Sequence, residues 1–131
     1  MPASPVPTPS APPVAGPYSP AVRAGDWILL AGQVGVDPTT GALVPGGAAA
    51  EVDQVLKNLA AVLSDCGATW ADVAKVTIFL AGSMDPFAVV NERYAAVLGQ
   101  HRPARSTVAV AALPLGAAVE IEAIVHRPDK E

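Results

Sequence analysis

The chain has 131 residues and a net charge of −4, and it is 51% hydrophobic but only 15% charged. This length fits one domain with its own hydrophobic core, and the low share of charged residues, against about 25% in a typical soluble domain, suggests that another subunit covers part of the surface. The scattered Lys and Arg residues argue against nucleic-acid binding, no apolar run approaches the roughly 20 residues that span a bilayer, and the single cysteine excludes an internal disulfide and is typical of a reducing cytoplasm.

The N-terminal segment differs in composition from the rest of the chain, because it is rich in Pro, Ala, Ser and Thr. Each proline removes a backbone donor, and the segment offers little apolar surface to bury. We therefore expect residues 1–15 to form a disordered or polyproline-like tail. The domain itself is expected over residues 16–131.

The domain is predicted to begin with β-strands. Residues 21–23 and 26–34 should form two strands around a turn at Ala24 and Gly25, since the second of them contains an unbroken apolar run. An Asp-Pro-Thr-Thr-Gly turn follows, and residues 42–44 are expected to form a further extended piece.

A helix is predicted at residues 51–66, where apolar residues recur every three or four positions. Gly67 follows it at the position where a left-handed residue commonly ends a helix. Residues 73–80 alternate and are rich in β-branched side chains, which predicts a strand. The side chains expected to be buried are Val52, Val55, Leu56, Leu59, Val62 and Leu63 in the helix and Ala74, Val76, Ile78 and Leu80 in the strand.

A second helix is expected to begin at Asp85, a favourable N-cap residue, with Pro86 at its first position and Gly99 at its end. Two strands should follow at residues 105–111 and 118–126, joined by a Leu-Pro-Leu-Gly turn. The apolar stripe of the helix comprises Phe87, Val90, Tyr94, Val97 and Leu98. This order of elements predicts an α+β fold, in which two helices cover one face of a mixed β-sheet and the other face requires another cover.

Common catalytic motifs are absent from the sequence. It has no glycine-rich phosphate loop, no CxxC and no HExxH, and no serine lies in a nucleophile elbow. The two histidines, His101 and His126, are far apart in the sequence, so they do not indicate a metal site. Cys66 is interpreted as a small apolar residue at a helix end.

The last two strands carry the residues of chemical interest. If they pair as a hairpin around residues 114 and 115, position 107 falls near Glu120 and Arg105 falls near Glu122. An arginine and two carboxylates then share one face of the sheet. A structural ion pair between Arg105 and either glutamate would explain the same pattern.

In these and other segments the chain is similar to the YjgF/RidA family. The resemblance covers residues 16–125 and rests on short pieces in the same order and at suitable spacings: Gly-Pro-Tyr-Ser-Pro-Ala-Val from Gly16, Ala-Gly-Gln-Val from Ala31, Asn58-Leu59, Asp-Val-Ala-Lys-Val-Thr from Asp72, Val90-Asn91 with Tyr94, Arg-Pro-Ala-Arg-Ser from Arg102, Leu113-Pro114, and Val-Glu-Ile-Glu-Ala from Val119. It implies a chorismate-mutase-like fold, and a homotrimer in which the sheets form a central barrel and ligand clefts lie between subunits.

The resemblance also implies an activity without a cofactor or metal: hydrolysis of reactive enamines and 2-imino acids to 2-oxo acids and ammonia. Arg105 would bind the carboxylate of the substrate, and Glu120 would act as the general base and acid. The implied cleft residues are Tyr18, Gly32, Asn91, Arg105, Thr107 and Glu120. Two alternatives stay open for Glu122, which is either a cleft residue or a partner in a structural ion pair. Two also stay open for Asn91, which is either a cleft residue or an exposed residue of the helix.

Two positions depart from the family pattern, since many members have Ser at Ala31 and Cys at Thr107. The change at Ala31 removes a hydroxyl contact and is expected to shift substrate preference, whereas Thr107 keeps its backbone donor. Two alternatives stay open: a non-catalytic trimer that binds small carboxylates or acts like a chaperone, and a pathway-specific deaminase of aminoacrylate- or aminomuconate-like compounds. The clearest sequence feature in favour of catalysis is the presence of both Arg105 and Glu120.

Overall fold

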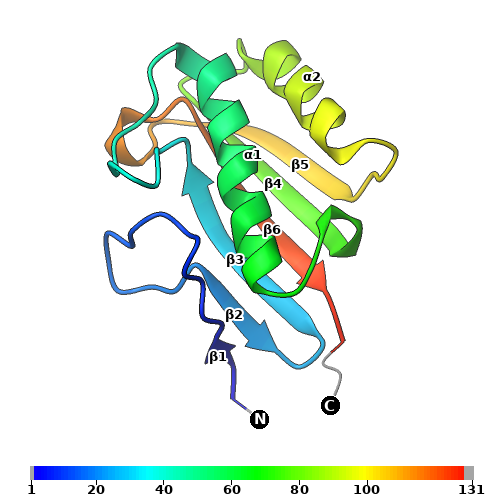
Figure 1. Ribbon diagram of the computed structural model, residues 1–131. Helices are drawn as coiled ribbons and strands as arrows, with labels where there is room; N and C mark the ends of the chain where they lie inside the picture. Colours follow the sequence, from blue (N-terminus) through cyan, green and yellow to red (C-terminus); the bar gives the residue numbers. More distant parts are fainter. Residues whose placement is uncertain (1, 129–131) are drawn as a thin grey trace.

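The computed structural model describes residues 2–128 and shows one mixed β-sheet with two helices packed on one of its faces (Figure 1). The sheet order is β1-β2-β3-β6-β4-β5, in which only the β4–β5 pair is parallel. The strands are β1 (Ser4–Pro5), β2 (Ala21–Ala24), β3 (Trp27–Val34), β4 (Val73–Ala81), β5 (Ala104–Val110) and β6 (Val119–His126), and the long helices are α1 (Gly47–Asp65) and α2 (Phe87–Leu98). The predicted α+β architecture is confirmed; residues 129–131 of the predicted domain lie outside the described residues.

The core lies between α1 and the covered face of the sheet. Every side chain of the expected helical set is buried, as are Val76, Ile78 and Leu80 of β4. Ala74 was expected in the same set but is only partly buried, and Val73 is buried instead, where the register with β6 shifts between Val73 and Lys75. Helix α1 begins at Gly47, four residues before the predicted start, because the alanines that precede Glu51 are strong helix formers. Gly67 adopts a left-handed φ of 72° directly after the helix, as predicted.

Smaller elements also differ slightly from the sequence predictions. Pro86 is the N-cap of α2 in place of Asp85, so this helix starts at Phe87. The expected extended piece at residues 42–44 amounts to a single bridge between Leu43 and Val36. Neither α1 nor α2, the long helices of residues 2–128, combines the length and apolar character needed to cross a membrane.

The predicted hairpin between β5 and β6 is wrong, because β4 lies between these strands. In β6 every second residue from Val119 to Val125 is buried, which suits a strand in the middle of the sheet, whereas β5 contains no buried residue and forms an edge. The chain passes from β5 to β6 through a 3-10 turn at Pro114–Gly116. This turn therefore crosses the end of β4 instead of closing a hairpin.

The N-terminal segment differs from the expected disordered tail. Ser4 and Pro5 form β1 along the free edge of β2, and a backbone bond from Val6 to the carbonyl of Ala21, 3.0 Å long, extends this pairing. Ser10 donates from its amide and its hydroxyl to the two carboxylate oxygens of Asp65, at 2.8 and 3.0 Å. Prolines are tolerated in an edge strand, so a segment rich in proline can still be anchored by an unpaired sheet edge.

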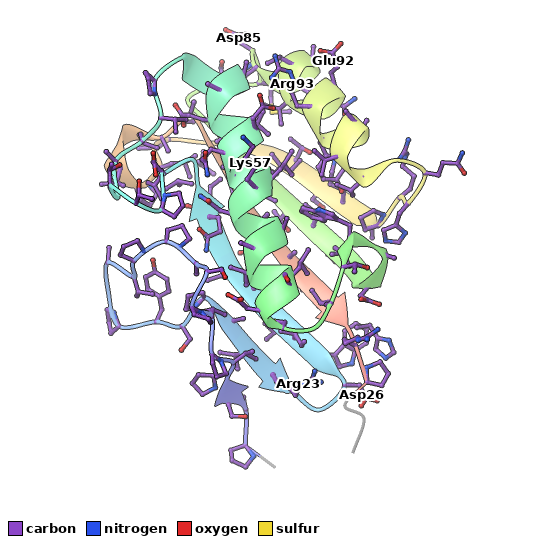
Figure 2. The ribbon with its side chains drawn as sticks, in the orientation of Figure 1. Arg23, Asp26, Lys57, Asp85, Glu92 and Arg93 are labelled. Carbon is purple, nitrogen blue, oxygen red and sulfur yellow. The ribbon has the colours of Figure 1, made fainter. Side chains whose placement is uncertain are left out.

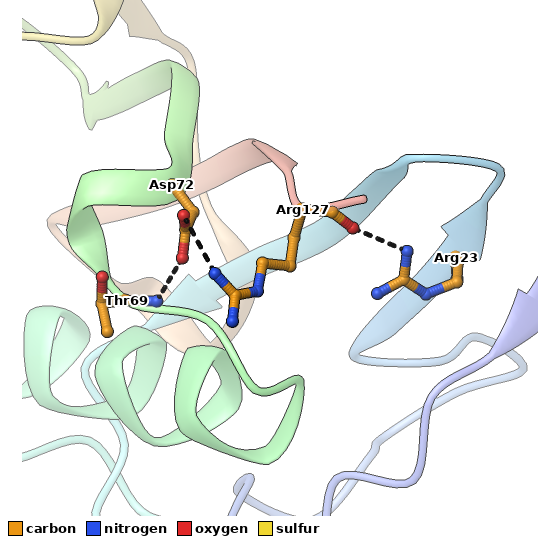
Figure 3. Close-up of polar contacts among 4 residues, drawn as sticks. All are labelled: Arg23, Thr69, Asp72 and Arg127. Atoms are coloured by element: carbon orange, nitrogen blue, oxygen red, sulfur yellow. Dashed lines mark hydrogen bonds and ion pairs between the residues drawn. The ribbon is translucent and has the colours of Figure 1, made fainter. Parts of the chain in front are cut away.

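Ion pairs tie the helices and the strand ends together. The charged side chains labelled in Figure 2 include Arg93 on α2, which pairs with Asp53 of α1. At the other end of the molecule, Arg23 donates to the carbonyl oxygen of Arg127 at 2.8 Å, and the guanidinium of Arg127 lies 3.7 Å from Asp72 (Figure 3). Asp72 also accepts a bond from the amide of Thr69 at 2.9 Å, which closes the turn before β4.

Candidate active site

Glu120 lies in a cavity of about 270 Å³ on the face of the sheet that the helices leave uncovered. The chain folds this way because Glu120 alternates along β6 with the buried residues Val119 and Ile121, which point toward α1. Tyr18 and Gly32 line the same cavity. Apart from Tyr18, Gln33 and Glu120, the wall is built from residues without polar side-chain atoms: Pro12, Pro13, Val14, Ala15, Pro20, Gly32, Val34, Val36, Gly41, Pro114 and Leu115.

Gly32 leaves the space that the Glu120 side chain occupies. A Cβ atom added at Gly32 would lie 3.0 Å from Cγ and 2.8 Å from Cδ of Glu120, and closer still to its Oε2. The ladder between β3 and β6 also shifts register between Leu30 and Gln33, beside this contact. A bulge of this kind re-aims side chains next to a site. The missing side chain at Gly32 therefore leaves room for the carboxyl group of Glu120.

The environment of Glu120 raises its pKa above the usual value of a glutamate. Burial in the cavity is the main cause, and the negative charge of Glu122 adds to it. Glu122 is exposed on the same face of β6, two residues along the strand. A carboxyl group with a raised pKa is suited to accept a proton and return it in the same reaction. This is the behaviour required of a general base that later becomes an acid.

Replacing Glu122 by glutamine is expected to lower the pKa of Glu120, because the substitution removes a neighbouring negative charge and leaves the burial unchanged. A reaction that needs the Glu120 carboxylate loses rate as the pH falls through that pKa. The acid limb of the pH profile of kcat should therefore move to lower pH in Glu122→Gln. An unmoved acid limb would show that Glu122 does not act on the titrating group.

Arg105 lies in a second cavity of about 390 Å³, between α2 and the edge strand β5. Asn91, Tyr94, Ala95, Arg102 and Pro103 line the rest of it. Within residues 2–128, no carboxylate or carbonyl pairs with the Arg105 guanidinium, which lies near the rings of Phe87 and Tyr94. A half-buried guanidinium without an anionic partner can donate hydrogen bonds to the carboxylate of a ligand.

The expected convergence of Arg105, Glu120 and Glu122 on one sheet face is wrong within a single chain. The register pairs Arg105 with Val76, which is buried under the helices, and pairs Phe79 with Glu120. Since residues 76 and 79 are an odd number of positions apart on β4, Arg105 and Glu120 lie on opposite faces. For the same reason, the alternative of a structural ion pair between Arg105 and either glutamate is contradicted.

The predicted cleft residues thus fall into two groups. We call the first the carboxyl pocket, which contains Tyr18, Gly32 and Glu120, and the second the guanidinium pocket, which contains Asn91 and Arg105. Asn91 is both exposed and part of its pocket, so the two interpretations of it are compatible. Thr107 lines neither pocket, and its hydroxyl is buried without a hydrogen-bond partner within residues 2–128.

Sequence reasoning missed the apolar wall of the carboxyl pocket. The sequence predicts residues 12–15 to belong to the tail, yet they lie with Tyr18 in the wall of this pocket. Leu115 also lines the pocket, with a left-handed φ of 61° that is rare for a leucine and a side chain that is 66% exposed. Strained residues of this kind are frequent at functional sites. The proline run before the Gly-Pro-Tyr segment was the one available sign of the wall.

Other groups with reactive or ligating side chains contribute to structure. Cys66 packs partly against the core at the C-terminus of α1, and burial, together with the charge of Asp65, raises the pKa of its thiol. A ring nitrogen of His101 lies 2.8 Å from the carbonyl oxygen of Val73. In the described range, residues 2–128, no three His, Cys, Asp or Glu side chains are grouped closely enough to hold a metal ion.

Comparison with known proteins shows what the whole chain is similar to. Residues 8–127 match the family described as Endoribonuclease L-PSP. The mouse 2-iminobutanoate/2-iminopropanoate deaminase is 48% identical over 117 residues, which cover 89% of this chain and 86% of the mouse protein. The crystal structure of RidA from the Antarctic bacterium Psychrobacter sp. PAMC 21119 superposes with a TM-score of 0.87 at 40% identity, covering 92% of this chain and 97% of that one. The structure of the YjgF gene product from E. coli gives 0.87 at 38% identity, covering 95% and 98%.

Proposed function

Because this chain belongs to the YjgF/RidA family, whose sequence model is described as Endoribonuclease L-PSP, we propose that it hydrolyses reactive 2-imino acids to 2-oxo acids and ammonia. The deaminase activity named for its relatives, at 44–48% identity over 89% of the chain in the mouse and human proteins, supports this reaction. The chemistry requires neither a metal nor an organic cofactor, since a protonated imine is already electrophilic. A cytoplasmic location is part of the proposal and is supported by the free thiol of Cys66.

A complete site requires the carboxyl pocket of one subunit to meet the guanidinium pocket of another. Glu120 and Arg105 lie on opposite faces of the sheet, so one chain cannot direct both at the same small molecule. The uncovered sheet face also exposes Trp27, Leu29, Val108 and Ile124, each between 38% and 45%. Such an apolar face is typical of a surface buried by association. A homotrimer with three sites between its subunits, as the family resemblance implies, satisfies both requirements.

Arg105 would bind the carboxylate of the substrate R–C(=NH₂⁺)–COO⁻. Its planar guanidinium can donate two parallel hydrogen bonds to the two carboxylate oxygens, which fixes the orientation of the neighbouring imine carbon. The absence of an ion pair or hydrogen-bond acceptor for Arg105 within residues 2–128 leaves these donors free for the ligand. The apolar wall of the carboxyl pocket would then receive the side chain R.

Glu120 would carry the proton through the reaction. Its carboxylate takes a proton from water while the water oxygen bonds to the imine carbon, which gives a neutral amino alcohol at that carbon. The proton then moves from Glu120 to the amine nitrogen, the carbon–nitrogen bond breaks, and ammonia leaves. The hydroxyl proton passes to the departing ammonia as the 2-oxo acid forms, so the products are the 2-oxo acid and ammonium, and Glu120 is a carboxylate again. The raised pKa of Glu120 supports both proton transfers.

The observation that carries the proposal is the half-buried carboxyl group of Glu120, which lies over Gly32 in a mostly apolar pocket beside Tyr18. To test it, an amino-acid oxidase generates short-chain imines in place, and the release of 2-oxo acid competes with a trapping nucleophile. The wild-type chain should accelerate release, and Glu120→Gln should not. Binding of 2-oxo acids without acceleration for any imine tested would favour a non-catalytic carboxylate-binding trimer instead.

A further inference from the structure

We propose that Tyr94 and Phe87 of α2 are positioning residues, whose ring faces hold the Arg105 guanidinium in the orientation that receives the substrate carboxylate. This inference rests on the proposed function of Arg105 and extends it to two side chains that do not themselves touch the reacting atoms. It gives Tyr94 a role beside its packing in the hydrophobic core, and gives a role to the partly exposed Phe87.

The geometry places both rings within the range of a cation–π interaction, about 6 Å. The central carbon of the Arg105 guanidinium lies 5.0 Å from the ring centroid of Tyr94 and 5.7 Å from that of Phe87. The two aromatic residues are seven positions apart on α2, so they lie on the same side of the helix and face the edge strand. The guanidinium therefore has aromatic neighbours from two positions of one helix that are about two turns apart.

Within residues 2–128, the Arg105 guanidinium has no ion pair or hydrogen bond that would hold it in place. Arg102, its neighbour in the guanidinium pocket, donates to the carbonyl oxygens of Gly99 and His101, but Arg105 makes no such bond within residues 2–128. A free arginine side chain carries about 2 kcal/mol of rotamer entropy, which a ligand would otherwise have to offset on binding. Ring faces can restrict the side chain without using any of the donors that the carboxylate needs.

The ring of Tyr94, and not its hydroxyl group, makes this contact. Tyr94 is only 4% exposed, and its hydroxyl has no hydrogen-bond partner within residues 2–128. Burial raises the pKa of Tyr94, so the phenol stays neutral and attracts the guanidinium through its ring face instead of a negative charge. A buried hydroxyl without a partner costs free energy, so its removal should be tolerated.

The test compares Tyr94→Phe with Tyr94→Leu, which keeps an apolar side chain but removes the ring. We measure KM and kcat for an imine, and the Kd of 2-oxobutanoate by calorimetry. Tyr94→Leu should raise KM and Kd roughly 2- to 30-fold, the range of a cation–π contact, with a much smaller change in kcat. Tyr94→Phe should match the wild type in both constants, and Phe87→Leu should show the same pattern as Tyr94→Leu with a smaller effect.

Val90→Ala is the matched control, because Val90 is a buried residue of the same helix, 1% exposed, without a ring. It should lower the melting temperature while KM and Kd stay near wild type. The inference is overturned if Tyr94→Leu keeps the wild-type Kd, if Tyr94→Phe loses as much affinity as Tyr94→Leu, or if Val90→Ala weakens binding equally. If the wild type binds 2-oxobutanoate but hydrolyses no imine, the proposed function fails while the comparison of Kd values still decides this inference.

Discussion

An equimolar mixture of Arg105→Ala and Glu120→Gln chains, reassembled from dissociated subunits, is expected to recover about a quarter of wild-type imine hydrolysis when sites form between subunits at random. Each variant alone should be nearly inactive. Loss of the general base costs on the order of 10²- to 10⁴-fold in kcat, and loss of one partner of a buried charge pair costs about 2–5 kcal/mol in kcat/KM.

The recovery follows from the position of the two residues on opposite faces of the sheet. In a mixed oligomer, about a quarter of the sites combine Arg105 from a Glu120→Gln chain with Glu120 from an Arg105→Ala chain, and these sites contain no substitution. The measurement is the imine assay after reversible dissociation. Each variant taken alone through the same treatment is the control, and a mixture no more active than the two controls would contradict a shared site.

Gly32→Ala is expected to lower kcat by about 100-fold, the cost of a misplacement of roughly 1 Å in a catalytic group. The new methyl group would take the space of the Glu120 side chain, since its Cβ would lie 2.8 Å from Cδ of that residue. The clash falls on the end of a flexible side chain, so the carboxyl group should move while the fold persists. The free energy of unfolding should therefore change little, as measured by denaturant titration.

Gly35→Ala is the contrasting variant. An added Cβ there would lie 2.7 Å from the backbone carbonyl oxygen of Glu51 and 2.8 Å from its Cα. Because the backbone of α1 cannot move aside as a side chain can, this variant should lose stability by about 1–3 kcal/mol. Equal losses of stability in the two variants, or full activity in Gly32→Ala, would show that the space over Gly32 has no role in placing Glu120.

Local sequence patterns predicted most of the elements correctly. The three- and four-residue spacing of Val52, Val55 and Leu59 predicted the buried face of α1, and the alternation around Val76 predicted that of β4. These patterns are visible in the sequence because helix and strand periods relate residues close together in the chain. The family resemblance then named Tyr18, Gly32, Asn91, Arg105, Thr107 and Glu120 as cleft residues, and all but Thr107 line one of the two pockets.

Local sequence patterns did not predict the order of the strands in the sheet. A short turn at residues 113–116 is compatible with a hairpin and also with a connection across the end of β4, because turn chemistry acts on a few neighbouring residues. Burial of apolar side chains decides between these two connections. Strand β6 carries an apolar set that is buried when it lies between β3 and β4, while β5 has no buried residue and lies at the edge. The N-terminal residues were likewise misassigned, since the edge of β2 that holds Ser4 and Pro5 exists only once the sheet has formed.

The sequence by itself thus determined the two long helices, the strands from β2 to β6, the buried faces of α1 and β6 and the side chains available for chemistry, because each depends on short-range periodicity or on residue type. The tertiary structure alone decided which face of the sheet each of those side chains occupies. Placing β4 between β5 and β6 turns Arg105 toward α2 and leaves Glu120 on the uncovered face. Pairing between strands distant in the chain is set by the burial of the whole sheet, and no local pattern contains that information.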